Sequence, residues 1–245
     1  MLGCGRSGTS LVAGILADAG WHLGDRLLGA DASNPTGYFE SRPVNLLNEE
    51  LLRPLPHGVL RAASGRPLAA RGLHEGERWL AALPTDVELP PRPEHEAAMQ
   101  EMLRAPEGVP VCRKDPRFTW TLPLWPLDHA MRVVVFREPL AAARSIVAMT
   151  DQGDLGLGLE GALAIWTSCS RRALARAELF PHRWTFVSYA SVLDGTGLPR
   201  LAEALGVDAL PTGRIDRGLQ RQRSAGDVPQ ETADAYARLL ERALV

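Results

Sequence analysis

The chain is poor in several features that define whole classes of protein. Lysine occurs once, at Lys114, against 26 arginines in 245 residues, and the formal net charge is only −2. This near-neutral balance argues against bulk binding to nucleic acid or to a membrane surface. No apolar run approaches the roughly 20 residues that a membrane-spanning helix needs, and no signal peptide is visible before the first motif.

Cysteine is also scarce. Cys4, Cys112 and Cys169 lack the spacing of a disulfide framework, so we expect reduced thiols in a cytoplasmic protein. A hydrophobic content of 45% and a charged content of 23% indicate a globular chain that is long enough to bury a sizeable core. No internal repeat or boundary divides the sequence, and we predict one domain over residues 1–245.

A glycine-rich loop stands at the start of the chain. Residues 3–10 read G-C-G-R-S-G-T-S, and the apolar, helix-forming run 11–17 follows directly. Such a loop offers backbone N–H groups at the positive end of a helix dipole, which is a site for phosphate or sulfate. The spacing matches G-x-x-x-x-G-K-[ST], but Thr9 replaces the lysine and Arg6 supplies the cation. The alternative is an ordinary glycine-rich turn before a helix.

Strand and helix patterns alternate along the rest of the chain. Residues 132–136 read R-V-V-V-F, which predicts a parallel strand buried on both faces and ending at Arg137. Residues 184–189 predict another strand, and residues 109–117 a short strand that ends in charge. Helices are expected at residues 9–20, 42–53, 139–149, 163–179 and 198–205, and from about residue 229 with Ala233, Tyr236, Leu240 and Leu244 on one face.

This alternation predicts an α/β protein with a P-loop-containing nucleotide-binding fold, in which helices flank both faces of a parallel sheet. Ligands bind such folds at the carboxyl ends of the strands. The glycine-rich loop, the Lys114 segment and Arg137 all belong at that edge.

Two segments fit this scheme less well. Residues 54–108 read as an irregular insertion, either disordered or lining an acceptor cleft, with Trp79 and Leu80 in a short helix. Only Met1 and Leu2 precede the loop, where a central strand is expected. Losing that strand would leave its neighbours' backbone groups unpaired, so we expect the native start to lie upstream of Met1.

The loop resembles the 5'-phosphosulfate loop of sulfotransferases that use 3'-phosphoadenosine 5'-phosphosulfate (PAPS), especially the Arg-Ser-Gly-Thr loop of carbohydrate and tyrosylprotein sulfotransferases. Residues 34–40, N-P-T-G-Y-F-E, are similar to a segment of bacterial sulfotransferases. The resemblance covers about residues 1–206. It implies transfer of a sulfuryl group to the hydroxyl of a sugar, a lipid or a natural product, with 3',5'-bisphosphoadenosine as the product and no metal.

The resemblance also implies roles for particular residues. Arg137 and Ser145 have the spacing of the pair that binds the 3'-phosphate. Tyr189 resembles a tyrosine near the adenine, although a plain core tyrosine is the alternative. Arg217 and Gly218 match a late phosphate loop poorly. The implied phosphosulfate loop consists of Gly5, Arg6, Ser7, Gly8, Thr9 and Ser10.

The catalytic groups implied by the resemblance are Lys114 and Arg6, beside the transferring sulfuryl group, and a general base. Small-molecule sulfotransferases have a histidine two residues after the lysine, where this chain has Pro116. Glu40 is therefore our candidate base, and its alternative role is a carboxylate facing the dipole of the next helix. Asp115 is the second candidate, which we expect Lys114 to hold ionised and weakly basic.

Other interpretations stay open. Lys114 and Arg117 could form a surface ion-pair cluster with Asp115. A P-loop kinase or NTPase is the alternative enzyme, but it needs an acidic residue at the end of an apolar strand to hold Mg²⁺, and Arg137 stands there. A catalytically inactive nucleotide-binding protein is the third class.

Overall fold

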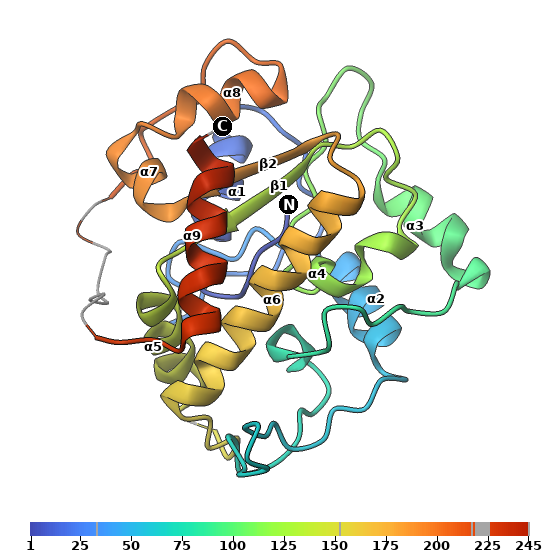
Figure 1. The fold of residues 1–245 in the computed structure, drawn as a ribbon. Helices are drawn as coiled ribbons and strands as arrows, with labels where there is room; N and C mark the ends of the chain where they lie inside the picture. The colour runs from blue at the N-terminus through green and yellow to red at the C-terminus, as the bar shows by residue number, and fades with distance from the viewer. Residues whose placement is uncertain (33, 152, 217, 219–225, 245) are drawn as a thin grey trace.

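Two parallel strands lie at the centre of the molecule (Figure 1). The computed structural model describes residues 1–32, 34–151, 153–216, 218 and 226–244. β1 (Arg132–Phe136) and β2 (Trp184–Ser188) pair with Arg132 opposite Trp184 and Phe136 opposite Ser188. Both strands were predicted from their runs of β-branched and aromatic residues.

The start of the chain extends this sheet by one residue. Leu2 forms a parallel bridge to Val134; its N–H donates to the Val133 carbonyl at 2.9 Å, and its own carbonyl accepts from the Val135 N–H at 3.0 Å. Leu2 thus satisfies two backbone groups of β1, the Val133 carbonyl and the Val135 N–H. The Met1 ammonium donates to the Arg113 carbonyl at 2.7 Å, which sets the Lys114 segment beside this edge.

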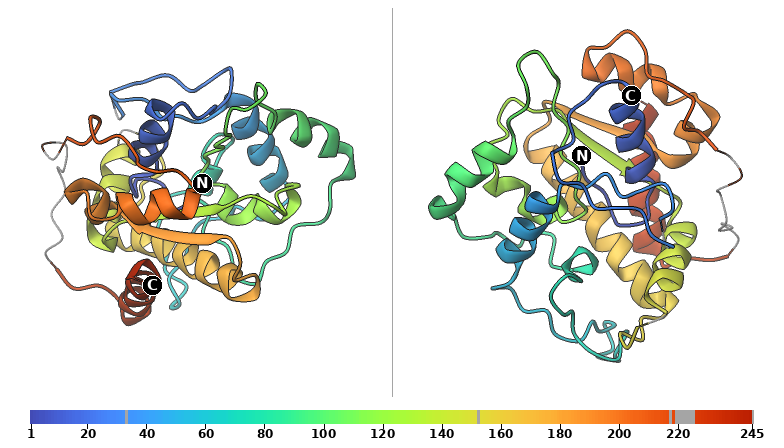
Figure 2. Two further views of the ribbon diagram at one scale, coloured as in Figure 1. Left: turned by 90° about the horizontal axis from the view of Figure 1, so that it is seen from above. Right: turned by 180° about the vertical axis from the view of Figure 1, so that it is seen from behind.

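Helices cover both faces of the sheet (Figure 2). Because side chains alternate along a strand, Val134 and Phe136 pack into one apolar cluster, and Val133 and Val135 into another. The first cluster includes residues of α5 (Pro139–Thr150), α6 (Leu159–Leu179) and α9 (Gln230–Leu244). The second includes α1 (Thr9–Asp18) and α8 (Leu198–Leu205). The predicted α/β fold with helices on both faces is confirmed.

Local signals place several helix ends where the sequence predicted them. α1 stops just before Gly20, whose φ of 85° is left-handed, and α8 is closed by Gly206 at φ 70°. α5 begins at Pro139, and the Glu138 carboxylate accepts from the N–H groups of residues 140 and 141 at 3.1 and 2.7 Å. α2 (Arg42–Leu52) matches the expected helix at residues 42–53.

Some local predictions were wrong. Residues 109–117 form no regular strand, and Val111 makes only an isolated bridge to His22. α6 begins at Leu159, earlier than the helix expected at residues 163–179, and α7 (Tyr189–Asp194) starts where the second strand was expected to end. α9 buries Ala235 and Leu239 and leaves Leu240 37% exposed, because the helix meets the core one position away from the expected face.

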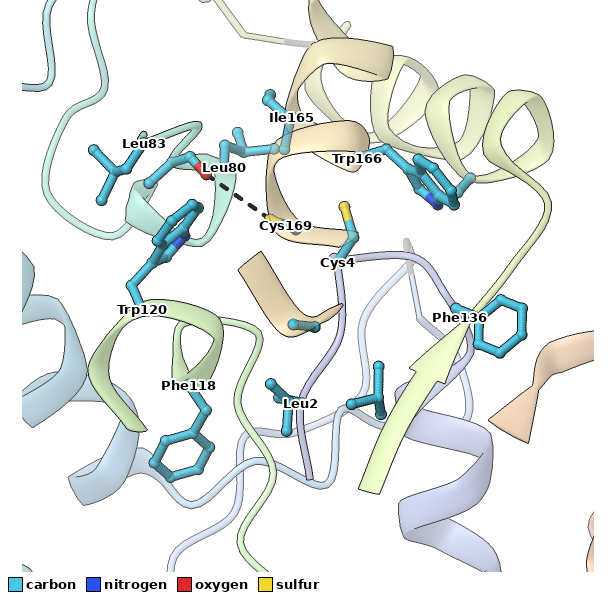
Figure 3. Packing of buried hydrophobic residues seen from close by; sticks show 14 of the residues in the cluster. Leu2, Cys4, Leu80, Leu83, Phe118, Trp120, Phe136, Ile165, Trp166 and Cys169 are labelled. Atoms are coloured by element: carbon cyan, nitrogen blue, oxygen red, sulfur yellow. Dashed lines mark hydrogen bonds between the residues drawn. The ribbon is translucent and has the colours of Figure 1, made fainter. Parts of the chain in front are cut away.

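The insertion at residues 54–108 lies wholly within the described residues and is largely irregular. Trp79 and Leu80 lie in the short helix η1 (Arg78–Leu80), as predicted. Leu80 and Leu83 are buried in the same cluster as Trp120 and Ile165 (Figure 3). The remaining short elements are η2 (Pro93–His95), α3 (Glu96–Met102), α4 (Phe118–Thr121) and η3 (Leu122–Leu124), and α3 was not foreseen. Among the described residues, no helix is both long and apolar enough to cross a membrane.

Candidate active site

The glycine-rich loop connects Leu2 to α1 at the carboxyl edge of the sheet. Arg6 has a φ of 68° and Gly8 a φ of 93°, so the loop turns through two left-handed residues before α1 begins. No side chain of the described residues caps the N-terminus of α1. The Leu11 N–H donates to the Gly8 carbonyl at 3.1 Å, and the two N–H groups before it stand at the positive end of the helix dipole, where an anion is favoured.

The Tyr189 side chain leaves no room for a side chain at position 8. A Cβ added at Gly8 would lie 2.3 Å from Cδ2 of Tyr189, which is closer than two carbon atoms can approach. The Tyr189 ring lies beneath the Arg137 guanidinium, 4.8 Å from its Cζ to the ring centroid. Tyr189 is only partly buried and lines the cavity described below, so it is not a plain core residue.

Two arginines meet at the start of α5. Arg137 follows β1, and the Arg6 side chain reaches the same region, where its Nε donates to the Ser145 hydroxyl at 3.1 Å. Burial lowers the pKa of Arg137, and the nearby Arg6 charge acts in the same direction. Two partly buried cations and a hydroxyl thus converge on a place suited to a multiply charged anion.

Lys114 is buried and joins three segments of the chain. Its Nζ donates to the Ser10 hydroxyl at 3.3 Å, to the Tyr38 carbonyl at 3.2 Å and to the Glu40 carboxylate. The other Glu40 oxygen accepts from Asn45 Nδ2 at 2.6 Å. The Glu40 carboxylate is thus bonded to the side chains of Lys114 and Asn45. The alternative role for Glu40, a carboxylate facing the dipole of the next helix, would place it at the start of α2, whose first turn contains no acidic residue.

Asp115 differs from the prediction made for it. It is 0% exposed, and burial raises the pKa of Asp115 to about 6, although the Arg117 charge opposes the shift. Its carboxylate accepts from Arg117, Asn45 and Asn48, and Lys114 is bonded to Glu40 instead. The expectation that Lys114 lowers the pKa of Asp115 was wrong. The Lys114–Arg117–Asp115 cluster is also buried, not at the surface.

One cavity of about 850 Å³ brings these groups together. Of the predicted site residues, only Ser7 does not line the cavity, and its side chain is buried at 1% exposure. The second candidate base, Asp115, does not line the cavity either. Arg217 lies outside the described residues, and the Gly218 N–H donates to the exposed Asp216 carboxylate at 2.8 Å. The predicted residues on the cavity wall are Gly5, Arg6, Gly8, Thr9, Ser10, Glu40, Lys114, Arg137, Ser145 and Tyr189.

Sequence reasoning missed several lining residues. Trp79 comes from the irregular insertion, and nothing in that part of the sequence indicates that it reaches the loop. Asn45 lies on α2 and contacts both candidate bases. Asn34, whose Nδ2 donates to Ser10 at 3.2 Å, belongs to the N-P-T-G-Y-F-E segment, so its position in that motif was an available signal.

Comparison with known proteins gives a structural match. No family model matches the chain, and no curated protein matches it by sequence. Among solved structures, the sulfotransferase domain of the olefin synthase from Synechococcus PCC 7002 superposes with a TM-score of 0.54. The match covers 98% of this chain and 92% of that one, at 14% sequence identity. The chain has the fold of a sulfotransferase domain.

Proposed function

We propose that the chain is a sulfotransferase that moves a sulfuryl group from PAPS to a hydroxyl acceptor. The observation that carries this proposal is the single cavity that joins the glycine-rich loop, Lys114 and Glu40 to the cluster of Arg6, Arg137 and Ser145. PAPS has two anionic ends, a 5'-phosphosulfate and a 3'-phosphate. The cavity offers the N-terminus of α1 with Lys114 for one end and Arg137 with Arg6 for the other, on a fold shared with a sulfotransferase domain.

No side chain of the described residues forms a capping hydrogen bond at the start of α1, which supports placing the donor there. The first-turn N–H groups of α1 and the Ser10 hydroxyl hold the 5'-phosphosulfate. Arg137 and Ser145 hold the 3'-phosphate, and Tyr189 lies beside the nucleoside. Arg6 bonds to Ser145 in the structure, so it neutralises charge between the two ends.

In the transfer step an acceptor hydroxyl attacks the sulfur in line. A new O–S bond forms, the S–O bond to the 5'-phosphate breaks, and 3',5'-bisphosphoadenosine leaves with the bonding electron pair. Glu40 takes the acceptor proton, because it lines the cavity and Asp115 does not. Lys114, which is bonded to Glu40 and Ser10, stabilises the negative charge that grows on the leaving oxygens.

Lys114 Nζ donates to the Glu40 carboxylate, so the proposed proton acceptor and the proposed charge stabiliser share one hydrogen bond. The acceptor belongs to the class of small molecules or glycans with a free hydroxyl.

Calorimetry with 3',5'-bisphosphoadenosine, and separately with ATP and Mg²⁺, tests the proposal. We expect the bisphosphate to bind at least about tenfold more tightly, because ATP has no 3'-phosphate for Arg137 to contact. Tighter binding of Mg·ATP, together with release of phosphate, would instead make the chain a P-loop kinase or NTPase. Tight binding of the bisphosphate without transfer to any acceptor in a panel of sugars, phenols and alcohols would make it an inactive nucleotide-binding protein.

A further inference from the structure

The start of the segment from Gly76 to Leu83 is hydrogen-bonded to a buried carboxylate. Glu49, on α2, is 6% exposed. Its Oε1 accepts from the Gly76 N–H at 2.8 Å and from Arg78 at 2.7 Å, and its Oε2 accepts from Arg117 Nε at 2.6 Å. Arg117 in turn donates to the Gly76 carbonyl at 3.1 Å. One side chain therefore ties the insertion to the helix and to the Lys114 segment.

The end of the same segment is hydrogen-bonded to side chains of α6. The Ser168 hydroxyl donates to the Leu83 carbonyl at 2.6 Å, and Arg172 donates to the Thr85 carbonyl at 2.6 Å. Leu80 and Leu83 anchor the apolar side of the segment in the core (Figure 3). The turn between these two attachments is held from both ends.

That turn carries Trp79 against the glycine-rich loop. A Cβ added at Gly5 would lie 2.5 Å from both Cε3 and Cζ3 of the Trp79 ring, so the ring packs directly on the Gly5 backbone. Trp79 and Gly76 both line the cavity, as do Pro116 and Arg117. An aromatic ring in this position covers the loop with apolar surface.

Such an arrangement has a chemical consequence for a loop that holds an activated sulfate. Water is a competing acceptor: its attack on sulfur forms an O–S bond, breaks the bond to the 5'-phosphate and releases sulfate, with the proton passing to solvent. Closing a site against water is a recognised way to suppress such side reactions. Glu49, Arg78 and Arg117 form a buried ion-pair cluster. Such a cluster adds little stability compared with apolar packing, so stability alone does not account for it.

We infer that Trp79 shields the donor sulfate from water and that Glu49 is the positioning residue that holds it against Gly5. The inference rests on the proposed function, because it concerns the same donor. Glu49 does not line the cavity, so it acts through Arg78, Arg117 and the Gly76 backbone.

The test measures sulfate release from PAPS with no acceptor added, alongside calorimetric affinity for 3',5'-bisphosphoadenosine. We expect Trp79→Ala to release sulfate at least about fivefold faster than the wild type, with affinity changed less than about threefold, because only the shield is lost. Trp79→Phe keeps a ring and should stay near the wild type. Glu49→Gln should behave like Trp79→Ala, since the carboxylate charge that holds both arginines is gone.

The matched control is Glu50→Gln, on the same helix, where Glu50 faces Arg53 and His95 outside the cluster. Trypsin provides a second measurement: we expect faster cleavage after Arg78 in Glu49→Gln and not in Glu50→Gln. Unchanged sulfate release in Trp79→Ala, with bisphosphate binding intact, would overturn this inference alone. A wild-type chain that binds no bisphosphate would overturn the proposed function and this inference with it.

Discussion

The proposed contact between Arg137 and a 3'-phosphate can be tested by comparing two nucleotides. 3',5'-Bisphosphoadenosine carries the 3'-phosphate and 5'-AMP lacks it, so the difference between their affinities isolates that group. We expect Arg137→Ala to weaken the bisphosphate and to leave 5'-AMP nearly unchanged. Arg137→Lys is the matched variant, because it keeps the charge and removes the planar fork.

The magnitude follows from the surroundings of Arg137. Its guanidinium is partly buried and rests 4.8 Å over the Tyr189 ring, so it is already positioned before the ligand binds. A hydrogen bond to a charged group contributes about 1.5–3 kcal/mol, which corresponds to a loss of roughly ten- to a hundredfold in affinity. Arg137→Lys should recover only part of this, since an ammonium makes a single-point contact.

Arg6 provides an internal check on the same site. Its Nε is 3.1 Å from the Ser145 hydroxyl, and its charge lowers the pKa of Arg137, so the two arginines share one electrostatic environment. The double variant Arg6→Ala/Arg137→Ala should therefore lose less affinity than the two single losses added together. Isothermal titration at fixed ionic strength measures all of these variants. Equal losses for the bisphosphate and 5'-AMP would refute the assignment of Arg137 to the 3'-phosphate.

Three further predictions concern the other end of the cavity. Lys114→Ala should lower kcat more than it raises KM for PAPS, measured with the best acceptor from a panel of sugars, phenols and alcohols; wild-type turnover would remove Lys114 from the transfer site. Glu40→Gln should lower kcat at least about a hundredfold with bisphosphate binding intact, and normal turnover would transfer the role of base to Asp115. Asp115 should make stability depend on pH: its folded pKa of about 6 lies above the ordinary 3.8, so its contribution is fully present below pH 4 and is lost as the pH rises through 6. Denaturant unfolding of the wild type and of Asp115→Asn at several pH values isolates this contribution, because the difference between their slopes should reach up to about 1.4 kcal/mol per pH unit; identical slopes would contradict the shift.

Local sequence determined the features that depend on neighbouring residues. Glycines at positions 3, 5 and 8 allowed the loop to be recognised, and φ 93° at Gly8 shows why a side chain does not fit there. The run of valines before Phe136 identified a strand buried on both faces, and Glu138-Pro139 identified the start of α5. These signals together placed the glycine-rich loop, the Lys114 segment and Arg137 at one edge of the sheet, and in the structure all three line one cavity.

Only the tertiary structure decided which charged groups pair with one another. Lys114 and Glu40 are 74 positions apart, and their contact depends on how α2 packs beside the sheet. The same packing buries Asp115 among Arg117, Asn45 and Asn48, and desolvation then raises its pKa, in contrast to what its neighbour in the sequence suggested. The bridge between Leu2 and Val134 and the packing of Trp79 on Gly5 are likewise long-range contacts. Periodicity and propensity act over a few residues, so no local pattern could indicate these contacts.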